Sequence, residues 1–415
     1  MRILHTCLRY PPATGGAETY IKEIIERTRH VGNTPGVELD YSPGVNSGAP
    51  GFATSEESLH DTSEVSGIRD VRVLTSNLRT HHPISKLDPE LLLDDPMYVQ
   101  RLHHLATPIF AYPRLQALKY YIGHHQPDIL HSYGFWYQPA DVTARYAKQH
   151  SLPFIFHPLY YENENRNKMI WQLYKNTVGK ITFAAADVVA VISPFEQSLI
   201  EQAGFSIKRF ELIPPGVDMA KFDRPRLNPY LKQNIQGKIL LTVSRVSPGK
   251  GLDELIQVLP DILKEVPDAQ LVILGEDFGL RTTLEHQVRK LGVVPHVHFL
   301  GRVEDHELVE WYQHADLFVH PSHYEAFGIV LAESLAAGTP VVARRTSAIP
   351  FVSPHERTGL LFKTDEELIQ HIITLLKNDS LREKYGQAGI KHIRNNFTWD
   401  KSIDKVLKLY DEFRK

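Results

Sequence analysis

Residues 321–338 read PSHYEAFGIVLAESLAAG and carry the strongest structural signal in the chain. A short apolar run at residues 317–320 precedes them, and Gly338-Thr339-Pro340 leads into another apolar run at residues 341–343. Glycine followed closely by proline is a typical end of a helix. A strand, a mostly apolar helix and a second strand in this order predict a βαβ unit, which is the building block of a parallel sheet.

The same alternation of short apolar runs and longer amphipathic segments extends over the 415 residues. It predicts strands at residues 3–6, 71–75, 129–131, 154–157 and 188–192, and again at 239–243, 271–274, 297–300, 317–320 and 341–343. Helical spacing of apolar residues marks 253–265, 366–377 and 402–413. We therefore predict an α/β fold with two Rossmann-like, doubly wound parallel sheets.

The length also favours two domains. We place an N-terminal domain at residues 1–210 and a C-terminal domain at 211–396, because Ile213-Pro214-Pro215-Gly216 punctuates the chain between them. A last helix, within residues 397–415, is expected to pack back on the first domain. Residues 32–67 are rich in Gly, Ser and Pro and poor in large apolar groups, which predicts a mobile insertion.

Composition excludes several classes of protein. Hydrophobic residues make up 42% and charged residues 23%, with a formal net charge of −3, which argues against nucleic-acid binding. The single cysteine, Cys7, fits a reducing compartment, and no apolar run is long enough for a signal peptide or a membrane span. We expect a cytoplasmic protein and leave peripheral contact with a membrane open. No histidine–acid pattern typical of a metal site is found.

Two carboxylates stand out within residues 321–338. Glu333 is the only charged residue between Gly328 and Ala343, so it needs a partner if it is buried. Glu325 lies near the predicted N-terminus of the helix, whose free amides and positive dipole end attract an anion. If the helical turn extended back to Glu325, both acids would share one side and could bind hydroxyls beside a phosphate. The alternative is that Glu333 pairs with a buried Arg or Lys.

Three other places offer groups that suit a phosphorylated ligand. Arg245 and Lys250 are cations on a Gly-rich loop after a predicted strand, where they could neutralise a departing diphosphate. Gly15 and Gly16 precede the first helix, although paired glycines are often only a turn. His157 ends a predicted strand, and the carboxyl ends of parallel strands face the ligand crevice.

These pieces, in this order, resemble the retaining glycosyltransferases of glycosyltransferase family four (group 1), which have the GT-B fold of two facing Rossmann-like domains. The resemblance implies that Glu325 contacts the transferred sugar and Glu333 the ribose. It also implies that Arg245 and Lys250 neutralise the leaving diphosphate and that His157 touches the donor sugar. Donor contacts through the backbone would come from Gly15, Gly16, Val303, Phe327, Gly328 and Ile329.

The resemblance further implies a metal-independent enzyme without a cofactor. It would transfer a hexose from a UDP- or GDP-linked sugar, bound by the C-terminal domain, to a glycan or glycolipid hydroxyl near the N-terminal domain. Residues 345–351 lack the glycines that the family often has there, which puts backbone contact with the donor at this point in doubt. The donor, the acceptor and the oligomeric state are not specified by the sequence.

Other readings stay open. A nicotinamide-dependent oxidoreductase would need Gly-x-Gly-x-x-Gly, which neither half provides. A sugar-nucleotide epimerase and a non-catalytic nucleotide-sugar-binding relative on the same fold are the alternatives. Basic and aromatic residues between 101 and 121 could contact an anionic lipid surface, or could simply be part of an amphipathic helix that covers its own core.

Overall fold

The computed structural model describes residues 1–13, 15–33, 67–81, 84–92, 95–105, 112–161, 168–224 and 226–414. Of the insertion predicted at residues 32–67, residues 34–66 lie outside this description. The chain forms two compact units. The first contains Met1–His157, Gln172–Val188 and Lys405–Lys415, and the second contains Pro158–Trp171 and Val189–Asp404.

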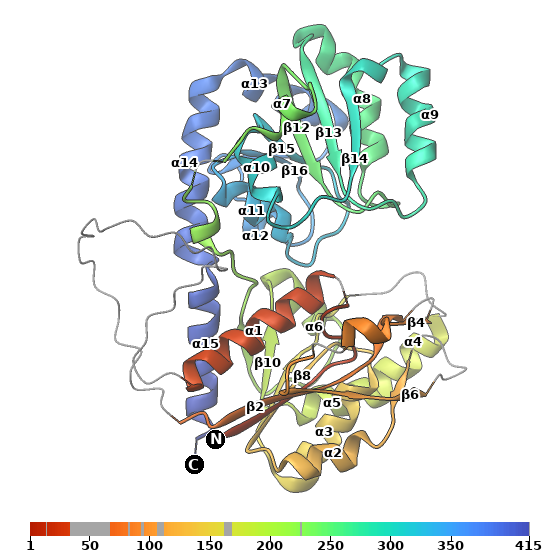
Figure 1. Ribbon diagram of the computed structural model, residues 1–415, viewed down its shortest axis with the longest axis vertical. Helices are drawn as coiled ribbons and strands as arrows, with labels where there is room; N and C mark the ends of the chain where they lie inside the picture. The colour runs from red at the N-terminus through yellow and green to blue at the C-terminus, as the bar shows by residue number, and fades with distance from the viewer. Residues whose placement is uncertain are drawn as a thin grey trace, which may run out of the picture. The chain divides into compact units, whose positions relative to one another are not determined.

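The first sheet has the strand order β11-β10-β9-β8-β1-β2-β5 (Figure 1). Its strands are β1 (Arg2–Thr6), β2 (Asp70–Ser76), β5 (Val99–Leu102), β8 (Ile129–Tyr133), β9 (Phe154–His157), β10 (Val188–Val191) and β11 (Phe210–Leu212). The five strands predicted in this half are confirmed, whereas β5 and β11 were missed because they are short and only partly buried. Two small antiparallel pairs stand apart: β3 (Leu78–His81) with β4 (Ile84–Lys86), and β6 (His104–Leu105) with β7 (Arg114–Leu115).

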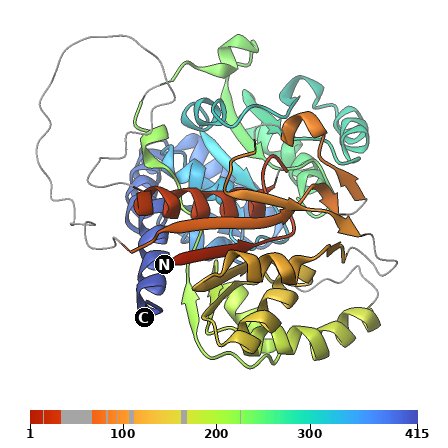
Figure 2. The same ribbon diagram turned by 60° about the horizontal axis from the view of Figure 1, so that its bottom comes forward.

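Helices cover this sheet on its two faces. Helices α2 (Leu118–His125), α3 (Gln138–His150) and α5 (Lys180–Ala185) lie side by side on one face (Figures 1 and 2). Helix α4 (Lys168–Tyr174) continues through a π-helical turn, Lys175–Gly179, into α5. Two further helices are α1 (Gly16–Asn33) and α6 (Pro194–Gln202). The idea of one amphipathic helix between residues 101 and 121 was wrong, because strands β5, β6 and β7 interrupt that stretch.

The second sheet has the order β14-β13-β12-β15-β16-β17. Its strands are β12 (Lys238–Val243), β13 (Ala269–Leu274), β14 (Val297–Gly301), β15 (Leu317–His320), β16 (Val341–Arg344) and β17 (Gly359–Phe362). Its helices are α7 (Pro229–Lys232), α8 (Leu252–Glu265), α9 (Arg281–Leu291), α10 (Leu308–Gln313), α11 (Ile329–Ala336), α12 (Ile349–Val352), α13 (Asp365–Lys377) and α14 (Asp379–Asn396). All five strands predicted here are confirmed, and β17 was missed.

The strand order of the second sheet decides where a ligand can bind. The chain runs outward from β12 through β13 to β14, and then returns to the other side of β12 to continue with β15. Strands β12 and β15 pair in parallel, with Leu240 opposite Leu317. The loops after these two strands therefore leave the sheet next to each other, at the switch point where open α/β sheets bind ligands.

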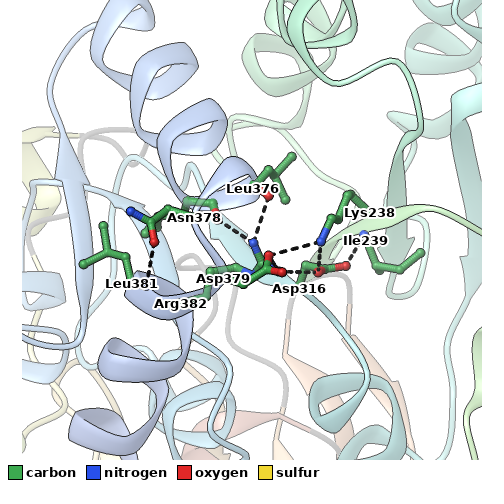
Figure 3. Close-up of polar contacts among 9 residues, drawn as sticks. Lys238, Ile239, Asp316, Leu376, Asn378, Asp379, Leu381 and Arg382 are labelled. Carbon is green, nitrogen blue, oxygen red and sulfur yellow. Dashed lines mark hydrogen bonds and ion pairs between the residues drawn. The ribbon is translucent and has the colours of Figure 1, made fainter.

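At the opposite end of these strands, charged groups join β12 to the helices behind the sheet (Figure 3). Lys238 Nζ lies 3.5 Å from Asp316 and 3.4 Å from Asp379. Arg382 contacts Asp316 at 3.1 Å and donates to the carbonyls of Leu375 and Leu376 at the end of α13. The network thus satisfies carbonyls that a helix end leaves without partners.

The boundary between the two units is not a single point. Strands β10 and β11 belong to the first sheet, although residues 189–404 are assigned to the second compact unit. Helix α15 (Trp399–Glu412) begins in the second unit, and its end, from Lys405 onward, belongs to the first. There Tyr410 lies with its hydroxyl 2.8 Å from Nδ1 of His131. No helix in the described part of the chain is long and apolar enough to span a bilayer.

Candidate active site

The two loops at the switch point of the second sheet are packed directly against each other. The carbonyl of Gly249, on the loop after β12, accepts a hydrogen bond of 3.0 Å from the amide of His323, after β15. Gly251 has φ +67°, and a Cβ on it would lie 2.4 Å from the carbonyl oxygen of Pro321. Glycine is therefore needed at position 251 both for its backbone conformation and for the approach of the second loop.

This packing brings Lys250 to Glu325. Lys250 Nζ lies 2.6 Å from Glu325 Oε1, and His320 Nε2 contacts the same oxygen at 3.0 Å. Burial opposes ionisation of Glu325, but the hydrogen bonds and charges of His320 and Lys250 outweigh burial and lower its pKa to about 2. The side chains of Lys250 and Glu325 stay 18% and 16% exposed, so a ligand can reach the pair.

The carboxylate is also held through its own backbone. The amide of Ala348 donates to the carbonyl of Glu325 at 3.1 Å, and the hydroxyl of Thr346 contacts the carbonyl of His323. The stretch 345–351, which lacks the glycines common in the family, therefore supports the Glu325 loop. The amide of Ala348 is therefore already hydrogen-bonded within the protein and is not available to donate to a ligand.

Helix α11 begins only at Ile329, after Gly328 with φ +91°. Glu325 is thus outside the helix, and helical spacing does not relate it to Glu333 as the sequence suggested. The side chain of Phe327 is buried against the rings of Phe351 and Phe397, at centroid distances of 6.4 and 5.5 Å. At Phe327 the backbone, rather than the ring, is what a ligand could contact.

Glu333 lies in α11 and is partly buried. Its Oε2 accepts a hydrogen bond of 3.1 Å from the hydroxyl of Tyr312, which belongs to α10. Burial raises the pKa of Glu333 to about 7; the hydrogen bond from Tyr312 and the charge of Lys221 lower it only in part, and nearby Asp305 adds to the rise. Among the described residues no ion pair joins Glu333 to an Arg or Lys within contact distance, so the predicted alternative of a buried salt bridge is not what the structure has.

Arg245 and Val303 occupy less constrained positions. Arg245 lies on the same loop as Lys250 but is exposed, with its guanidinium carbon 5.4 Å from the ring centroid of Phe278. Val303 is partly buried and follows the end of β14 by two residues. The structure thus brings Lys250 into contact with Glu325. Arg245 lies on the same loop as Lys250.

The other predicted residues, Gly15, Gly16 and His157, belong to the first unit. Gly15 precedes α1, Gly16 is its first residue, and a Cβ on Gly15 would meet the carboxylate of Glu18, which pairs with Arg9 at 2.5 Å. His157 is fully buried, and its Nδ1 lies 3.1 Å from the hydroxyl of Tyr20. Burial lowers the pKa of His157 to about 3, so its ring is neutral near pH 7.

Two residues of the candidate site were missed from the sequence. His320 ends strand β15, and the strand-end argument that selected His157 would have selected His320 as well. Tyr312 gives no such signal, because nothing local relates it to a carboxylate 21 residues further along the chain.

Comparisons with known proteins identify the family of this chain. A family model described as glycosyl transferases group 1 matches residues 223–392, and one described as Glycosyltransferase Family 4 matches residues 70–221. The chain is 32% identical over 241 residues to D-inositol 3-phosphate glycosyltransferase of Corynebacterium efficiens, covering 55% of this chain and 57% of that protein. It is 35% identical over 208 residues to phosphatidyl-myo-inositol mannosyltransferase of Mycobacterium tuberculosis, covering 48% and 53%. The matches thus span little more than half the length of these relatives.

Solved structures share the fold over nearly the whole chain. Sucrose-phosphate synthase from Thermosynechococcus elongatus superimposes with a TM-score of 0.72 at 20% identity, covering 99% of this chain and 98% of that one. HepE of Anabaena, solved with UDP, gives a TM-score of 0.74 at 18% identity, covering 99% and 100%. The predicted GT-B fold is therefore confirmed. The two family models lie end to end over most of the described chain, and the protein belongs to the glycosyltransferases of group 1 and family four.

Proposed function

We propose that this protein is a retaining glycosyltransferase that moves a hexose from a nucleotide-diphosphate sugar to a hydroxyl of a glycan or glycolipid. The donor is UDP- or GDP-linked, and no metal takes part. The second unit binds the donor, and the first unit binds the acceptor. The observation that carries the proposal is the Lys250–Glu325 pair at the switch point of the second sheet, partly exposed beside the start of α11.

The two carboxylate oxygens of Glu325 have different partners. Lys250 and His320 both contact Oε1. Oε2 is then the oxygen offered to a hydroxyl of the transferred sugar. The amides of Phe327, Gly328 and Ile329 approach the diphosphate, because the start of a helix favours an anion. Glu333, held by Tyr312, accepts from the ribose hydroxyls.

In the reaction, the acceptor oxygen bonds to the anomeric carbon on the face from which the diphosphate leaves, so the anomeric configuration is kept. The bond between that carbon and the phosphate oxygen breaks, and its electron pair stays with the diphosphate. The acceptor proton passes to the departing phosphate. Lys250 and Arg245 stabilise the charge that develops there.

The first experiment screens UDP-, GDP- and ADP-sugars by thermal shift and then measures release of the nucleotide from the best binder. Lys250→Ala should lower turnover by about a hundredfold, because a charge on the leaving group is left without a partner, while donor affinity falls much less. Lys290→Ala, an exposed lysine of α9, is the matched control and should behave as wild type. Wild-type turnover in an Arg245→Ala/Lys250→Ala double variant would refute the leaving-group role.

The same assay separates the alternatives. A glycosyltransferase releases nucleotide faster when a hydroxyl acceptor is added, and nuclear magnetic resonance of the product shows the anomeric configuration of the donor. A sugar-nucleotide epimerase would instead convert the donor without an acceptor and without net release of nucleotide. Donor binding with neither outcome would identify a non-catalytic relative.

A further inference from the structure

A cluster of three polar side chains lies close to the Lys250–Glu325 pair and has no part in the proposed reaction. Glu254 belongs to the first turn of α8. Its Oε1 lies 2.8 Å from Nε2 of His323, and its Oε2 contacts the guanidinium of Arg344. These residues come from the segments that follow β12 and β15 and from the end of β16, which are neighbouring strands of the second sheet. The cluster therefore connects three segments at the edge of the sheet where the donor site lies.

The cluster also holds the residues that lead to Glu325. The guanidinium of Arg344 has a second partner, because its Nε donates to the carbonyl of Pro321 at 3.0 Å. The next residue, Ser322, is buried, and its hydroxyl lies 3.5 Å from Nζ of Lys250. Both contacts are made only a few residues before Glu325, so they decide where its carboxylate lies relative to Lys250.

The position of Arg344 is itself well determined. Its side chain is only 15% exposed, and its guanidinium carbon lies 4.9 Å from the ring centroid of Phe362. A guanidinium can reach the carboxylate of Glu254 and the carbonyl of Pro321 together, because its donors form a rigid planar fork that a lysine lacks. Charge-assisted hydrogen bonds of this kind are stronger than neutral ones. Arg344 is thus a fixed support for the chain before Glu325.

We propose that Glu254 and Arg344 are positioning residues of the donor site, which hold residues 321–323 so that Glu325 can bind the transferred sugar. The inference rests on the proposed function, because it requires that Glu325 contacts that sugar. Its consequence is selective. Displacement of Glu325 weakens binding of the nucleotide sugar and leaves binding of the free nucleotide diphosphate unchanged, because the free nucleotide has no sugar for Glu325 to contact.

The test measures both affinities by calorimetric titration, with UDP-glucose against UDP or GDP-mannose against GDP, whichever pair the thermal-shift screen selects. In Glu254→Gln and in Arg344→Lys, affinity for the nucleotide sugar should fall at least about fivefold, while affinity for the free nucleotide should change less than about twofold. Turnover should fall by about tenfold or more in both variants, because small displacements of a group that orients the substrate are costly.

Glu265→Gln is the matched control. Glu265 belongs to the same helix as Glu254 and forms an ion pair with Lys377, but it lies at the other end of α8 and is 55% exposed. The chemical change is the same, so both affinities and turnover should stay as in wild type. Circular dichroism and urea denaturation show that each variant is folded. A loss of affinity for the free nucleotide as large as the loss for the nucleotide sugar would overturn the inference, since it would indicate general damage to the site.

The double variant Glu254→Gln/Glu325→Ala shows whether Glu254 acts through Glu325. If it does, the double variant should bind the nucleotide sugar as weakly as Glu325→Ala alone, because the second change has nothing left to displace. Additive losses would overturn the inference and leave the role of Glu325 intact. Unchanged affinity in Glu325→Ala alone would refute the contact between Glu325 and the sugar, and the inference with it.

Discussion

At the scale of single residues, the two carboxylates of the site have different surroundings and therefore different pKa values. Glu325 contacts a lysine and a histidine and has its pKa lowered to about 2, whereas Glu333 contacts a tyrosine and has its pKa raised to about 7. Glu325 is therefore ionised at any physiological pH. Glu333 changes charge within the physiological range, so the two acids respond differently when the pH is varied.

That difference predicts a pH dependence of donor binding. Ribose hydroxyls donate hydrogen bonds more strongly to an ionised carboxylate, so affinity for UDP-glucose should rise as Glu333 loses its proton. Between pH 6 and pH 8 the gain should approach about tenfold for a pKa of about 7. Calorimetric titration with UDP-glucose measures it, because its diphosphate has no group that titrates near neutral pH. Glu333→Gln should bind more weakly and with a flat profile; a pH-dependent Gln variant would assign the effect to another group.

At the scale of elements, the loop after β12 depends on Gly251. Gly251→Ala would meet both the unfavourable φ of +67° and the carbonyl of Pro321. We expect a loss of more than about 2 kcal/mol in the free energy of unfolding, together with weaker donor binding, since Lys250 is displaced. Gly249→Ala is the matched control. It has φ +82° with open space around the new methyl group, so it should lose only about 1 kcal/mol. Urea denaturation of both variants gives the comparison, and equal losses would show that the close approach to Pro321 has no energetic weight.

The charged network at the other end of the second sheet makes a purely structural prediction. Arg382 is mostly buried, with 12% of its side chain exposed, and it holds Asp316, Asp379 and two carbonyls of α13 (Figure 3). Arg382→Ala should reduce the free energy of unfolding by about 1–2 kcal/mol, because the carbonyls of Leu375 and Leu376 lose the guanidinium donor and Asp316 keeps only Lys238 as a cation.

Arg394→Ala provides the control for that change. Arg394 is 60% exposed and pairs with Asp223 at 3.6 Å, so its removal should cost less than about 0.5 kcal/mol. Donor affinity should stay unchanged in both variants, since the network lies at the opposite end of the strands from Lys250. If the Arg382→Ala variant were fully folded and still lost most of its donor affinity, the network would not be independent of the donor site.

At the scale of the whole molecule, the two units should respond to acid differently. The first unit buries a stack of histidines: His131 lies 4.9 Å from His5 and 4.8 Å from His157 between ring centroids. Burial lowers the pKa of His5 and of His157 to about 3, and that of His131 well below its usual value. The unfolded chain binds protons at these groups below about pH 6.5 while the folded chain does not, so acid destabilises the first unit.

Differential scanning calorimetry at pH 7 and pH 5 checks this expectation. The transition of the first unit should move to lower temperature at pH 5. Each buried histidine should lower the free energy of unfolding by up to about 1.4 kcal/mol for each pH unit below about 6.5. In the second unit Glu333 acts with the opposite sign, because a raised carboxyl pKa removes stability as the pH rises from 4.5 to about 7. His131→Asn should reduce the acid effect on the first unit by about a third. The exposed His124→Asn should leave it unchanged, and an equal response of these two variants would rule out the buried stack as the cause.

The sequence by itself determined the two parallel sheets, most of their strands, and the loops that carry Lys250 and Glu325. These follow from local signals: runs of apolar residues, glycine and proline at helix ends, and charged residues directly after strands. It did not determine where the helix that contains Glu333 begins; the backbone conformation of Gly328 sets that start at Ile329.

Only the tertiary structure decided which groups meet. Strand order sets β12 beside β15, which joins Lys250 to a carboxylate 75 residues away, and helix packing gives Glu333 its partner Tyr312. The physical reason is the same in each case. Topology and burial select partners that are distant in sequence, and the local pattern of residues does not report such contacts.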